Sequence, residues 1–439
     1  MKNWINVWCC VLTAIESDTP RTGTHPLARG LFLFYITFID RKSMQLRPHQ
    51  QRITDRMLAY DKGQVIVPTG GGKTMCMIQD TITAHDAINN GTTTVVVAPR
   101  ILLAEQLCSE FLELIDTSNT HSMHIHSGET HHYSTTKADK IHLFANTART
   151  AGENVLIFTT YNSLDRVMQA DIEVNTIYFD EAHNSVKRNF FPATEFFSDA
   201  ADRCYFFTAT RKTSITINKP GMNDEAVYGQ IIARVSAPEL VEGGYIIPPR
   251  IQAKQFSMHK NTRMISCETD AENVIDTIEE TGTKKILVCV KTSRQLMNLM
   301  SATDFAIQLA QRGYSCLYIT SKTGAVVDGR KVNREEFFNT LNAWGKDPEK
   351  KFVVLHRSIL SEGINVSELE TVIFLRNMDV IEMTQTIGRV LRLGAESKTF
   401  GLCVVPVYSQ VGVATERALQ NVVDTVFEKG ELLDSVVRR

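Results

Sequence analysis

Seven consecutive residues with the sequence PTGGGKT have the composition of a loop that binds phosphate. Glycines let backbone N–H groups approach phosphate oxygens closely, and the N-terminus of a following helix adds a favourable dipole. The lysine can reach the β- and γ-phosphates, and the last threonine can offer its hydroxyl to Mg²⁺. We therefore predict binding of ATP and Mg²⁺. The predicted nucleotide ligands are Pro68, Thr69, Gly70, Gly71, Gly72, Lys73 and Thr74.

One position departs from the general pattern G-x-x-x-x-G-K-[ST] of such loops, because Val67 stands where the first glycine is expected. The alternative interpretation is a glycine-rich turn that binds nothing. A strand-like run from Gln64 to Val67 precedes the loop, and residues 75–84 can form a helix after it. This order of elements is the one that a phosphate site at a helix N-terminus needs, and it favours binding.

A pair of acids follows another strand-like run further along the chain. The apolar run from Thr176 to Phe179 is followed at once by Asp180 and Glu181. In folds with a phosphate-binding loop, an Asp at such a place helps to hold Mg²⁺, and a neighbouring carboxylate can orient or deprotonate the attacking water. We predict that Asp180 and Thr74 hold Mg²⁺ and that Glu181 acts on the water. The alternative is a solvated strand end.

Two arginines near the C-terminus are three residues apart. Arg389 and Arg392 would share one face of a helix and could direct two guanidinium groups into one anionic site. Phosphoryl transfer gains roughly 10³ to 10⁵ in rate from such an arginine. An exposed basic helix is the alternative interpretation of this spacing.

These three pieces, in this order, resemble the superfamily 2 helicases of the DEAH-box kind over about residues 44–410. Smaller motifs of that family recur between them, and the ordered set carries the resemblance. The chain is similar to phage DNA-repair and recombination helicases and to the motor subunits of type III restriction enzymes. The smaller matching segments are Leu46 to Gln50, Val95 to Arg100, Thr159 to Tyr161, Thr208 to Thr210, Val288 to Thr292 and Ser361 to Asn365.

The resemblance implies roles for particular residues. The catalytic residues would be Lys73, Glu181, Arg389 and Arg392. Further nucleotide contacts would come from Gln50, which meets adenine, and from Gly363, Asn365 and Gln385. Coupling of hydrolysis to movement would rest on His183, Thr208 and Thr210. Nucleic acid would contact Pro99, Arg100, Thr159, Thr160, Lys291 and Thr292. Relatives usually have Asp where this chain has Asn365, whose amide oxygen can still accept a hydrogen bond from ribose.

The elements that position these residues form two series. Strand-like runs at 65–67, 95–98, 155–158, 176–179 and 205–207 alternate with helical stretches, and runs at 286–290, 316–319, 352–355, 372–375 and 402–407 repeat the pattern. This alternation predicts parallel α/β sheets. With the resemblance, it predicts an α/β fold of two tandem RecA-like P-loop domains with an ATP cleft between them. Glycines and prolines near residues 241–249 place the boundary, giving domains at 44–240 and 241–439.

The first 43 residues carry no family motif. Their apolar run from Leu31 to Ile39 is shorter than the roughly 20 residues that span a bilayer, so no membrane association is expected. Translation could begin at Met44, or residues 1–43 could add a helix or strand to the first domain. After the second domain, residues 410–439 suffice for a helix. Large modules that separate strands are absent, so partners from replication, recombination or restriction are expected.

Composition adds little to the choice of substrate. The net charge of −2 neither supports nor excludes nucleic acid. Nine scattered cysteines without a C-x-x-C pair indicate a reducing interior and argue against a zinc or iron–sulfur module, so we expect a cytoplasmic protein, in the host cytoplasm if it is viral, with the nucleus as an alternative. A histidine-rich patch is either a metal site or a polar surface loop between motifs. Its members are His121, His124, His126, His131 and His132.

The function predicted from these observations is an ATP-dependent helicase or translocase that acts on DNA by unwinding, branch remodelling or annealing. DNA is favoured over RNA because the motifs look most like those of DNA-directed members, and no segment resembles a module that selects 2′-hydroxyls. An RNA helicase is the alternative. Two others stay open: an ATP-gated scaffold that binds nucleic acid without hydrolysis, and a P-loop enzyme that acts on a small metabolite.

Overall fold

The computed structural model describes residues 45–87, 91–128, 130–216, 218–255, 263–320, 323–357, 369–375, 379–392, 398–407 and 410–437. All structural statements below concern these residues. The chain divides into a unit at Met1–Gln45 and a unit at Leu46–Arg439. The expectations for residues 1–43 and for Gly363 and Asn365 lie outside the described residues.

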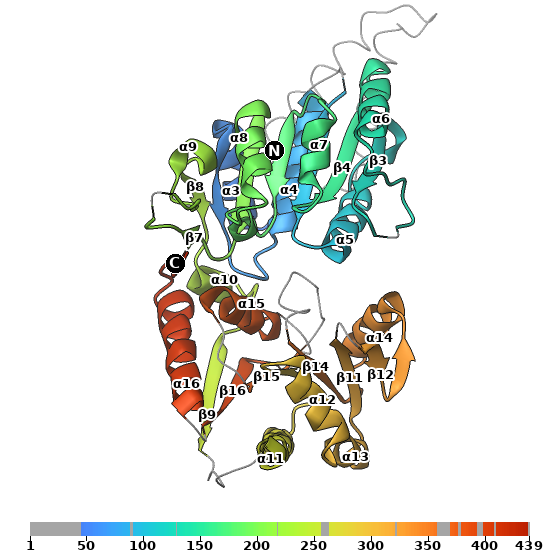
Figure 1. Cartoon of the computed structure of the whole chain (residues 1–439). Coiled ribbons are helices and arrows are strands. Elements are labelled where there is room, and N and C mark those ends of the chain that lie inside the picture. Colours follow the sequence, from blue (N-terminus) through green and yellow to red (C-terminus); the bar gives the residue numbers. More distant parts are fainter. Residues whose placement is uncertain are drawn as a thin grey trace, which may run out of the picture. The chain divides into compact units, whose positions relative to one another are not determined.

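A seven-stranded sheet forms the first half of the larger unit, in the order β3-β4-β2-β5-β6-β1-β8 (Figure 1). All of its neighbouring strands pair in parallel. Strands buried on both faces become continuous apolar runs, as in the segment from Val95 to Ala98. The strands are β1 (Lys62–Ile66), β2 (Thr93–Ala98), β3 (Thr120–Ile125), β4 (Asn154–Thr160), β5 (Thr176–Phe179), β6 (Arg203–Thr208) and β8 (Ile231–Arg234).

Helices cover both faces of this sheet. One face packs Val97 and Phe179 against apolar side chains of α6, α7 and α8. On the other face, the ring of Phe111 on α5 meets that of Phe158 at a centroid distance of 5.4 Å, and Tyr205 donates a hydrogen bond to the carbonyl of Met57 on α3. The helices are α3 (Pro48–Ala59), α4 (Lys73–Ala87), α5 (Ile101–Leu112), α6 (Ala138–Thr150), α7 (Leu164–Gln169), α8 (Phe191–Ala200), α9 (Glu225–Tyr228) and α10 (Ala237–Glu242).

An eight-stranded sheet forms the second half, in the order β13-β12-β11-β14-β10-β15-β16-β9. The strands from β11 to β9 in this order pair in parallel, whereas β12 and β13 add an antiparallel edge. The strands are β9 (Pro249–Gln255), β10 (Lys285–Cys289), β11 (Ser315–Thr320), β12 (Gly324–Val327), β13 (Arg330–Val332), β14 (Phe352–His356), β15 (Thr371–Phe374) and β16 (Gly401–Val407).

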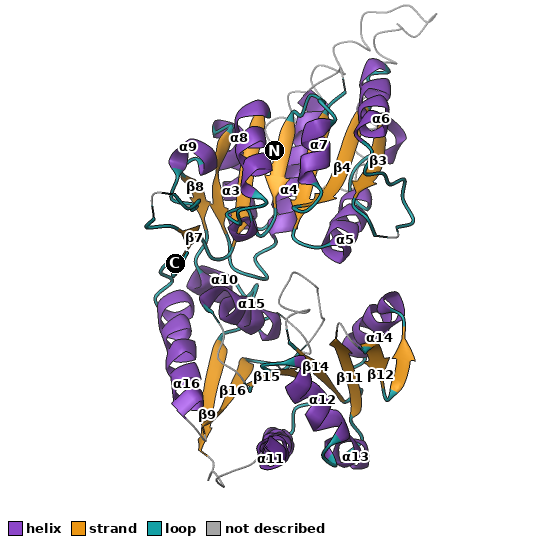
Figure 2. Cartoon of the chain, viewed as in Figure 1, coloured by secondary structure: helices purple, strands orange, loops and turns teal. Residues whose placement is uncertain are grey.

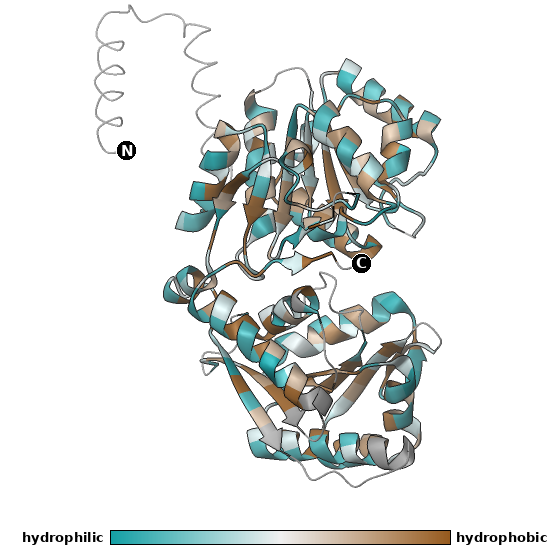
Figure 3. Ribbon diagram, turned by 60° about the vertical axis from the view of Figure 1, so that its left-hand side comes forward, coloured by the Kyte–Doolittle hydropathy of each residue, from teal (hydrophilic) through white to brown (hydrophobic). Residues whose placement is uncertain are grey.

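Helices of the second half alternate with these strands (Figure 2). Apolar residues of α11, α12 and α13 pack with Ile286, Val288 and Val353 in one core. Figure 3 shows the strands of both sheets as mainly hydrophobic and the helices as mixed in polarity. The helices are α11 (Arg263–Thr281), α12 (Ser293–Ser301), α13 (Phe305–Gln311), α14 (Arg334–Lys346), α15 (Val380–Val390) and α16 (Gln410–Val422).

The end of the chain returns to the first half. After α16 and a π-helical turn at Val423–Glu428, β17 (Ser435–Val436) pairs in parallel with β7 (Lys212–Thr213). Arg211 reinforces this pairing, because its guanidinium lies 2.6 Å from the carboxylate of Asp434. The residues after the second sheet therefore connect both sheets.

The predicted fold class is confirmed. Each of the ten predicted runs overlaps a strand of the structure, and the mixed α/β architecture has two largely parallel sheets in tandem. Among the described residues, no helix is both long and apolar enough to cross a membrane.

Candidate nucleotide site

The glycine-rich loop joins β1 to the first residue of α4, which is Lys73. Gly70 and Gly72 have positive φ angles of 89° and 77°, a conformation that favours glycine. Helix α3 holds the loop from one side, because His49 Nε2 lies 2.9 Å from the carbonyl oxygen of Gly71 and Gln50 Nε2 donates to that of Gly72 at 3.3 Å. The loop is thus fixed by its sequence and by side chains from α3.

The acids follow β5, as predicted, and both are buried. Asp180 and Glu181 are 6% and 7% exposed. Glu181 has a φ of 46°, and a residue other than glycine adopts this left-handed conformation at an energetic cost. Tyr161 and Asn184 donate hydrogen bonds to the carbonyl oxygens of Asp180 and Glu181, at 2.9 Å and 3.0 Å. The surrounding structure therefore maintains the strained turn that directs the carboxylates.

Lys73 forms an ion pair with Glu181, with 3.1 Å between Nζ and Oε1. Burial opposes both charges, but the pair offsets it, so that the pKa of Glu181 lies below its ordinary value and that of Lys73 above it. Asp180 behaves differently, because burial and then the Glu181 carboxylate raise its pKa to about 7. One acid is thus ionised near neutral pH, whereas the other changes charge there.

His183 connects these acids to the next strand. Its Nδ1 lies 3.6 Å from Glu181 Oε2 and 3.1 Å from the hydroxyl of Thr208 at the end of β6. The Thr208 hydroxyl in turn donates to the carbonyl of Thr210 at 2.9 Å. Burial lowers the pKa of His183 to about 4, so the imidazole is neutral. The three predicted coupling residues therefore form one buried chain of polar contacts that ends on Glu181.

A cavity of about 320 Å³ brings the predicted residues together. Helix α15 contributes Gln385 and Arg389 to its wall, and Arg392, which follows the end of this helix, also lines it, so three segments distant in sequence share one space. Gly71 and Gln50 do not line it, although the rest of the predicted loop does. The lining residues are Arg47, Pro68, Thr69, Gly70, Gly72, Lys73, Thr74, Leu103, Gln106, Leu107, Glu110, Asp180, Glu181, Tyr245, Gln385, Arg389 and Arg392.

Neither arginine is exposed, because Arg389 is buried and Arg392 is partly buried, which argues against the alternative of an exposed basic helix. Arg389 is 3% exposed. Burial, and then repulsion by Arg392, lower the pKa of Arg389 to about 9, and burial also lowers that of Arg392. Gly388 brings this helix against the phosphate-binding loop, because a Cβ atom at Gly388 would lie 2.6 Å from the Cβ atom of Thr69. The cavity thus concentrates positive charge that an anion would stabilise.

The place expected for Gln50 differs from the prediction. The side chain is buried between the Gly72 carbonyl and the backbone N–H of Arg47, which donates to Gln50 Oε1 at 2.9 Å. The cavity is lined instead by Arg47 and Tyr245. The Arg47 guanidinium lies 4.6 Å from the ring centroid of Tyr245. The adenine contact stays a prediction, because Gln50 packs inward on α3 while Arg47, which precedes the helix, lines the cavity.

Residues of α5 were also missed. Leu103, Gln106, Leu107 and Glu110 line the cavity at intervals of three and four residues, which is one face of a helix. Their amphipathic spacing could have been read from the sequence, but nothing in it showed which surface that face meets.

The predicted nucleic-acid contacts lie where parallel strands end. Pro99 and Arg100 follow β2, and Arg100 is exposed. Thr159 and Thr160 end β4, but Thr159 is fully buried and donates its hydroxyl to the Ile125 carbonyl at 2.9 Å. Lys291 and Thr292 follow β10 and are exposed, with Thr292 capping α12 by accepting from the Gln295 N–H.

Two family models match this chain. The type III restriction enzyme res subunit model matches residues 43–213, and the helicase conserved C-terminal domain model matches residues 269–394. The chain is a superfamily 2 helicase. The first match lies on the first sheet and the second match lies on the second sheet. The DEAH-box subtype and the phage resemblance stay predictions.

Solved structures share the fold of this helicase at low identity. The type ISP restriction-modification enzyme LlaBIII bound to DNA has a TM-score of 0.66 and 17% identity over 90% of this chain and 31% of the other. A putative HsdR subunit of a type I restriction enzyme from Vibrio vulnificus YJ016 has a TM-score of 0.57 and 16% identity, over 89% of this chain and 68% of the other. Mss116p bound to single-stranded RNA and AMP-PNP has a TM-score of 0.59 and 15% identity, over 92% of this chain and 76% of the other.

The chain spans 31% of the length of LlaBIII and 28% of the length of a second type ISP restriction-modification enzyme, LlaGI, in complex with a DNA substrate mimic. No curated protein matches its sequence significantly.

Proposed function

We propose that this chain is an ATP-driven translocase or helicase that acts on DNA. The observation that carries the proposal is the single cavity in which Lys73, Asp180 and Glu181 face Arg389 and Arg392. A pure binding site for nucleotide needs neither a water-activating carboxylate nor paired arginines, whereas phosphoryl transfer uses both. The cavity volume of about 320 Å³ lies at the lower end of the range for small-molecule sites.

The polar atoms of the cavity fit a nucleoside triphosphate. Among the described residues, Thr69 Oγ1 and Arg392 Nε are buried without a hydrogen-bond partner, and such donors are costly to leave unmatched. Phosphate oxygens would accept from both. Backbone N–H groups at the start of α4 and the Lys73 ammonium would hold the same phosphates. Arg47 and Tyr245 offer a cation and an aromatic face on which an adenine base could stack.

Thr74 and Asp180 have the oxygen ligands that Mg²⁺ prefers. When bound there, Mg²⁺ supplies charge neutralisation between the β- and γ-phosphates. Glu181 keeps its carboxylate ionised through Lys73, so it can accept a proton from water. Arg389 and Arg392 would balance the charge that develops on the phosphoryl oxygens.

The polar chain from Glu181 through His183 to Thr208 offers a route for coupling. A change in the Glu181 carboxylate alters the field at the neutral imidazole, which is hydrogen-bonded to the end of β6. We propose that loss of the γ-phosphate is sensed along this chain of contacts. Arg211, three residues after Thr208, connects the same segment to the C-terminal strand.

The choice of DNA rests on the comparisons. The res subunit model is that of a restriction enzyme, and two structural neighbours are restriction enzymes in complex with DNA or with a DNA substrate mimic. RNA is the second candidate, because Mss116p shares the fold and is bound to single-stranded RNA. The buried thiols in the described parts are compatible with a reducing, cytoplasmic location, which we include in the proposal.

Steady-state hydrolysis of ATP tests this proposal directly. We would measure turnover with Mg²⁺ alone and then with single-stranded DNA, duplex DNA, branched DNA or RNA, using Glu181→Gln as the blank. We expect DNA to stimulate turnover and RNA to have little effect. Stimulation by RNA alone would replace DNA with RNA as the track. Tight binding of nucleic acid without any turnover would refute the motor and favour a scaffold.

A further inference from the structure

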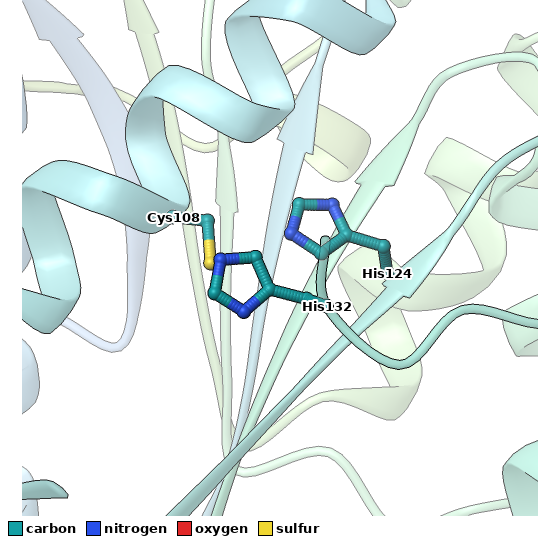
Figure 4. A group of neighbouring side chains, drawn as sticks. All are labelled: Cys108, His124 and His132. Carbon is teal, nitrogen blue, oxygen red and sulfur yellow. The ribbon is translucent and has the colours of Figure 1, made fainter. Parts of the chain in front are cut away.

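A group of metal-ligating side chains lies outside the nucleotide cavity, at the edge of the first sheet. It consists of Cys108 on α5, His124 on β3 and His132 in the segment between β3 and α6. One ligand atom of each residue lies within 4.8 Å of those of the other two. Figure 4 shows Cys108 and a ring nitrogen of each histidine directed toward one another.

The alternative of a polar surface loop does not hold for His124 and His126, whereas His131 is exposed and His132 is partly exposed in the segment after β3. His124 and His126 are 0% and 3% exposed, and His124 lies on a strand. Cys108 is distant from these histidines in the sequence, because it lies on the preceding helix α5 and approaches them only in the folded chain. Burial of several imidazoles in one place needs a compensating interaction.

His124 supplies the second observation. Its Nδ1 lies 3.0 Å from His126 Nε2, whereas its Nε2 is buried and has no hydrogen-bond partner among the described residues. The Gly128 N–H donates to His126 Nδ1 at 3.3 Å. In the metal-free protein, His126 therefore carries its proton on Nε2 and donates it to His124, which leaves the His124 Nε2–H facing the cluster unsatisfied.

We propose that Cys108, His124 and His132 bind a Zn²⁺ ion. One thiolate and two imidazoles form a mixed sulfur and nitrogen donor set, which suits Zn²⁺ and disfavours Mg²⁺ or Ca²⁺. Tetrahedral bonds of about 2.3 Å to sulfur and about 2.0 Å to nitrogen place such ligand atoms roughly 3.5 Å apart, so small side-chain rotations are sufficient. The fourth position is open to water, because His132 is partly exposed.

Proton balance sets the cost of binding. On binding, the proton of His124 shifts from Nε2 to Nδ1, where it forms a hydrogen bond to His126 Nε2. The proton of His126 shifts from Nε2 to Nδ1, and the long hydrogen bond from the Gly128 N–H is lost. Each histidine keeps one proton. The only proton released is that of the Cys108 thiol, since a coordinating thiol is deprotonated. His126 becomes the acceptor that orients His124, a role typical of groups behind metal ligands.

The ion would connect three segments of the first domain. It would fix His132 and its segment to β3 and α5. Helix α5 also lines the nucleotide cavity through Leu107, the residue next to Cys108. The proposed ion would therefore stabilise the wall of the cavity without contacting its contents.

The test is a zinc titration on the full chain, followed by desalting and elemental analysis, with Cys108→Ser and His132→Ala as loss variants. His131→Ala is the matched control, because His131 is an exposed neighbour in the same segment and lies outside the group. We expect about one Zn²⁺ per chain in the wild type and in the control, and none in the loss variants. His126→Ala should weaken binding by roughly 10- to 100-fold.

Cobalt substitution gives a second readout that does not depend on activity. A thiolate-to-Co²⁺ charge-transfer band should appear in the wild type and vanish in Cys108→Ser. Circular dichroism, recorded on each variant, shows whether it is folded. A wild type that retains no zinc would overturn the proposal, as would folded loss variants that retain it or a control that loses it. Each outcome is independent of ATP hydrolysis, so the proposed motor function can fail or hold separately.

Discussion

Gly388→Ala is the substitution whose effect follows most directly from the structure. Gly388 lies within α15, next to Arg389, and faces Thr69 of the phosphate-binding loop. The added Cβ atom would lie 2.6 Å from Thr69 Cβ and 3.1 Å from both Cγ2 and Oγ1. Carbon atoms in contact prefer about 3.5–4.0 Å, so the helix and the loop must separate by about 1 Å.

Two opposing terms decide the consequence for stability. Alanine favours the helix over glycine by about 1 kcal/mol, and an overpacked contact costs about 1–3 kcal/mol. The net change in the free energy of unfolding is therefore at most about 2 kcal/mol, and the chain stays folded. Catalysis is more sensitive, because a 1 Å displacement of a catalytic group can cost about 100-fold. We expect the kcat for ATP to fall about 100-fold, or about 2.7 kcal/mol of barrier.

The assay is a double-mutant cycle with Thr69→Gly, which removes the atoms that clash. We would measure kcat at saturating Mg²⁺, ATP and nucleic acid in all four proteins, together with thermal unfolding. In the Thr69→Gly background, Gly388→Ala should lower turnover only slightly further, which makes the two changes strongly non-additive. Wild-type turnover in Gly388→Ala, or a loss of the same size in the Thr69→Gly background, would refute the contact as the cause.

Three further predictions follow from the buried charges. Glu181→Gln should keep ATP binding but lower turnover by roughly 10²- to 10⁴-fold, and retention of more than a tenth of wild-type turnover would exclude Glu181 as the base. Asp180 is proposed to hold Mg²⁺ as a carboxylate and its pKa is raised to about 7, so Mg²⁺ affinity should fall about tenfold per pH unit below that value and level off above it. Removing the Glu181 charge should move this inflection to lower pH, which titrations of Mg²⁺ binding on both proteins would show. Arg203→Ala removes the partner of Asp80, whose side chain is 1% exposed, and should lower the free energy of unfolding in urea by about 3–5 kcal/mol. Arg149→Ala breaks a pair whose acid, Glu173, is 64% exposed, and should lower it by at most about 1 kcal/mol.

Among the described residues, the sequence was sufficient for ten of the fifteen strands of the two sheets, because buried parallel strands are continuous apolar runs, whereas β3, β8, β9, β12 and β13 were not predicted. The segment from Thr176 to Phe179 is such a run, and its following acids take their position from it. The phosphate-binding loop was equally legible, because the loop itself needs its glycines. The proposed stacking site for adenine was not, since Arg47 and Tyr245 meet only through tertiary contacts. Cys108 was missed for the same reason.

The places where this chain breaks local rules coincide with its sites. Glu181 adopts a left-handed backbone, Arg389 is buried beside the charge of Arg392, and His124 presents a polar atom without a partner among the described residues. Each feature costs free energy in the isolated chain, and a natural sequence otherwise avoids such conflicts. A ligand would remove the cost at the two polar features, with phosphate at the arginines and a soft cation at the histidine. A free-energy cost that a ligand can relieve is therefore a physical criterion for a site. This criterion selects the proposed zinc site by the same reasoning that selects the nucleotide cavity.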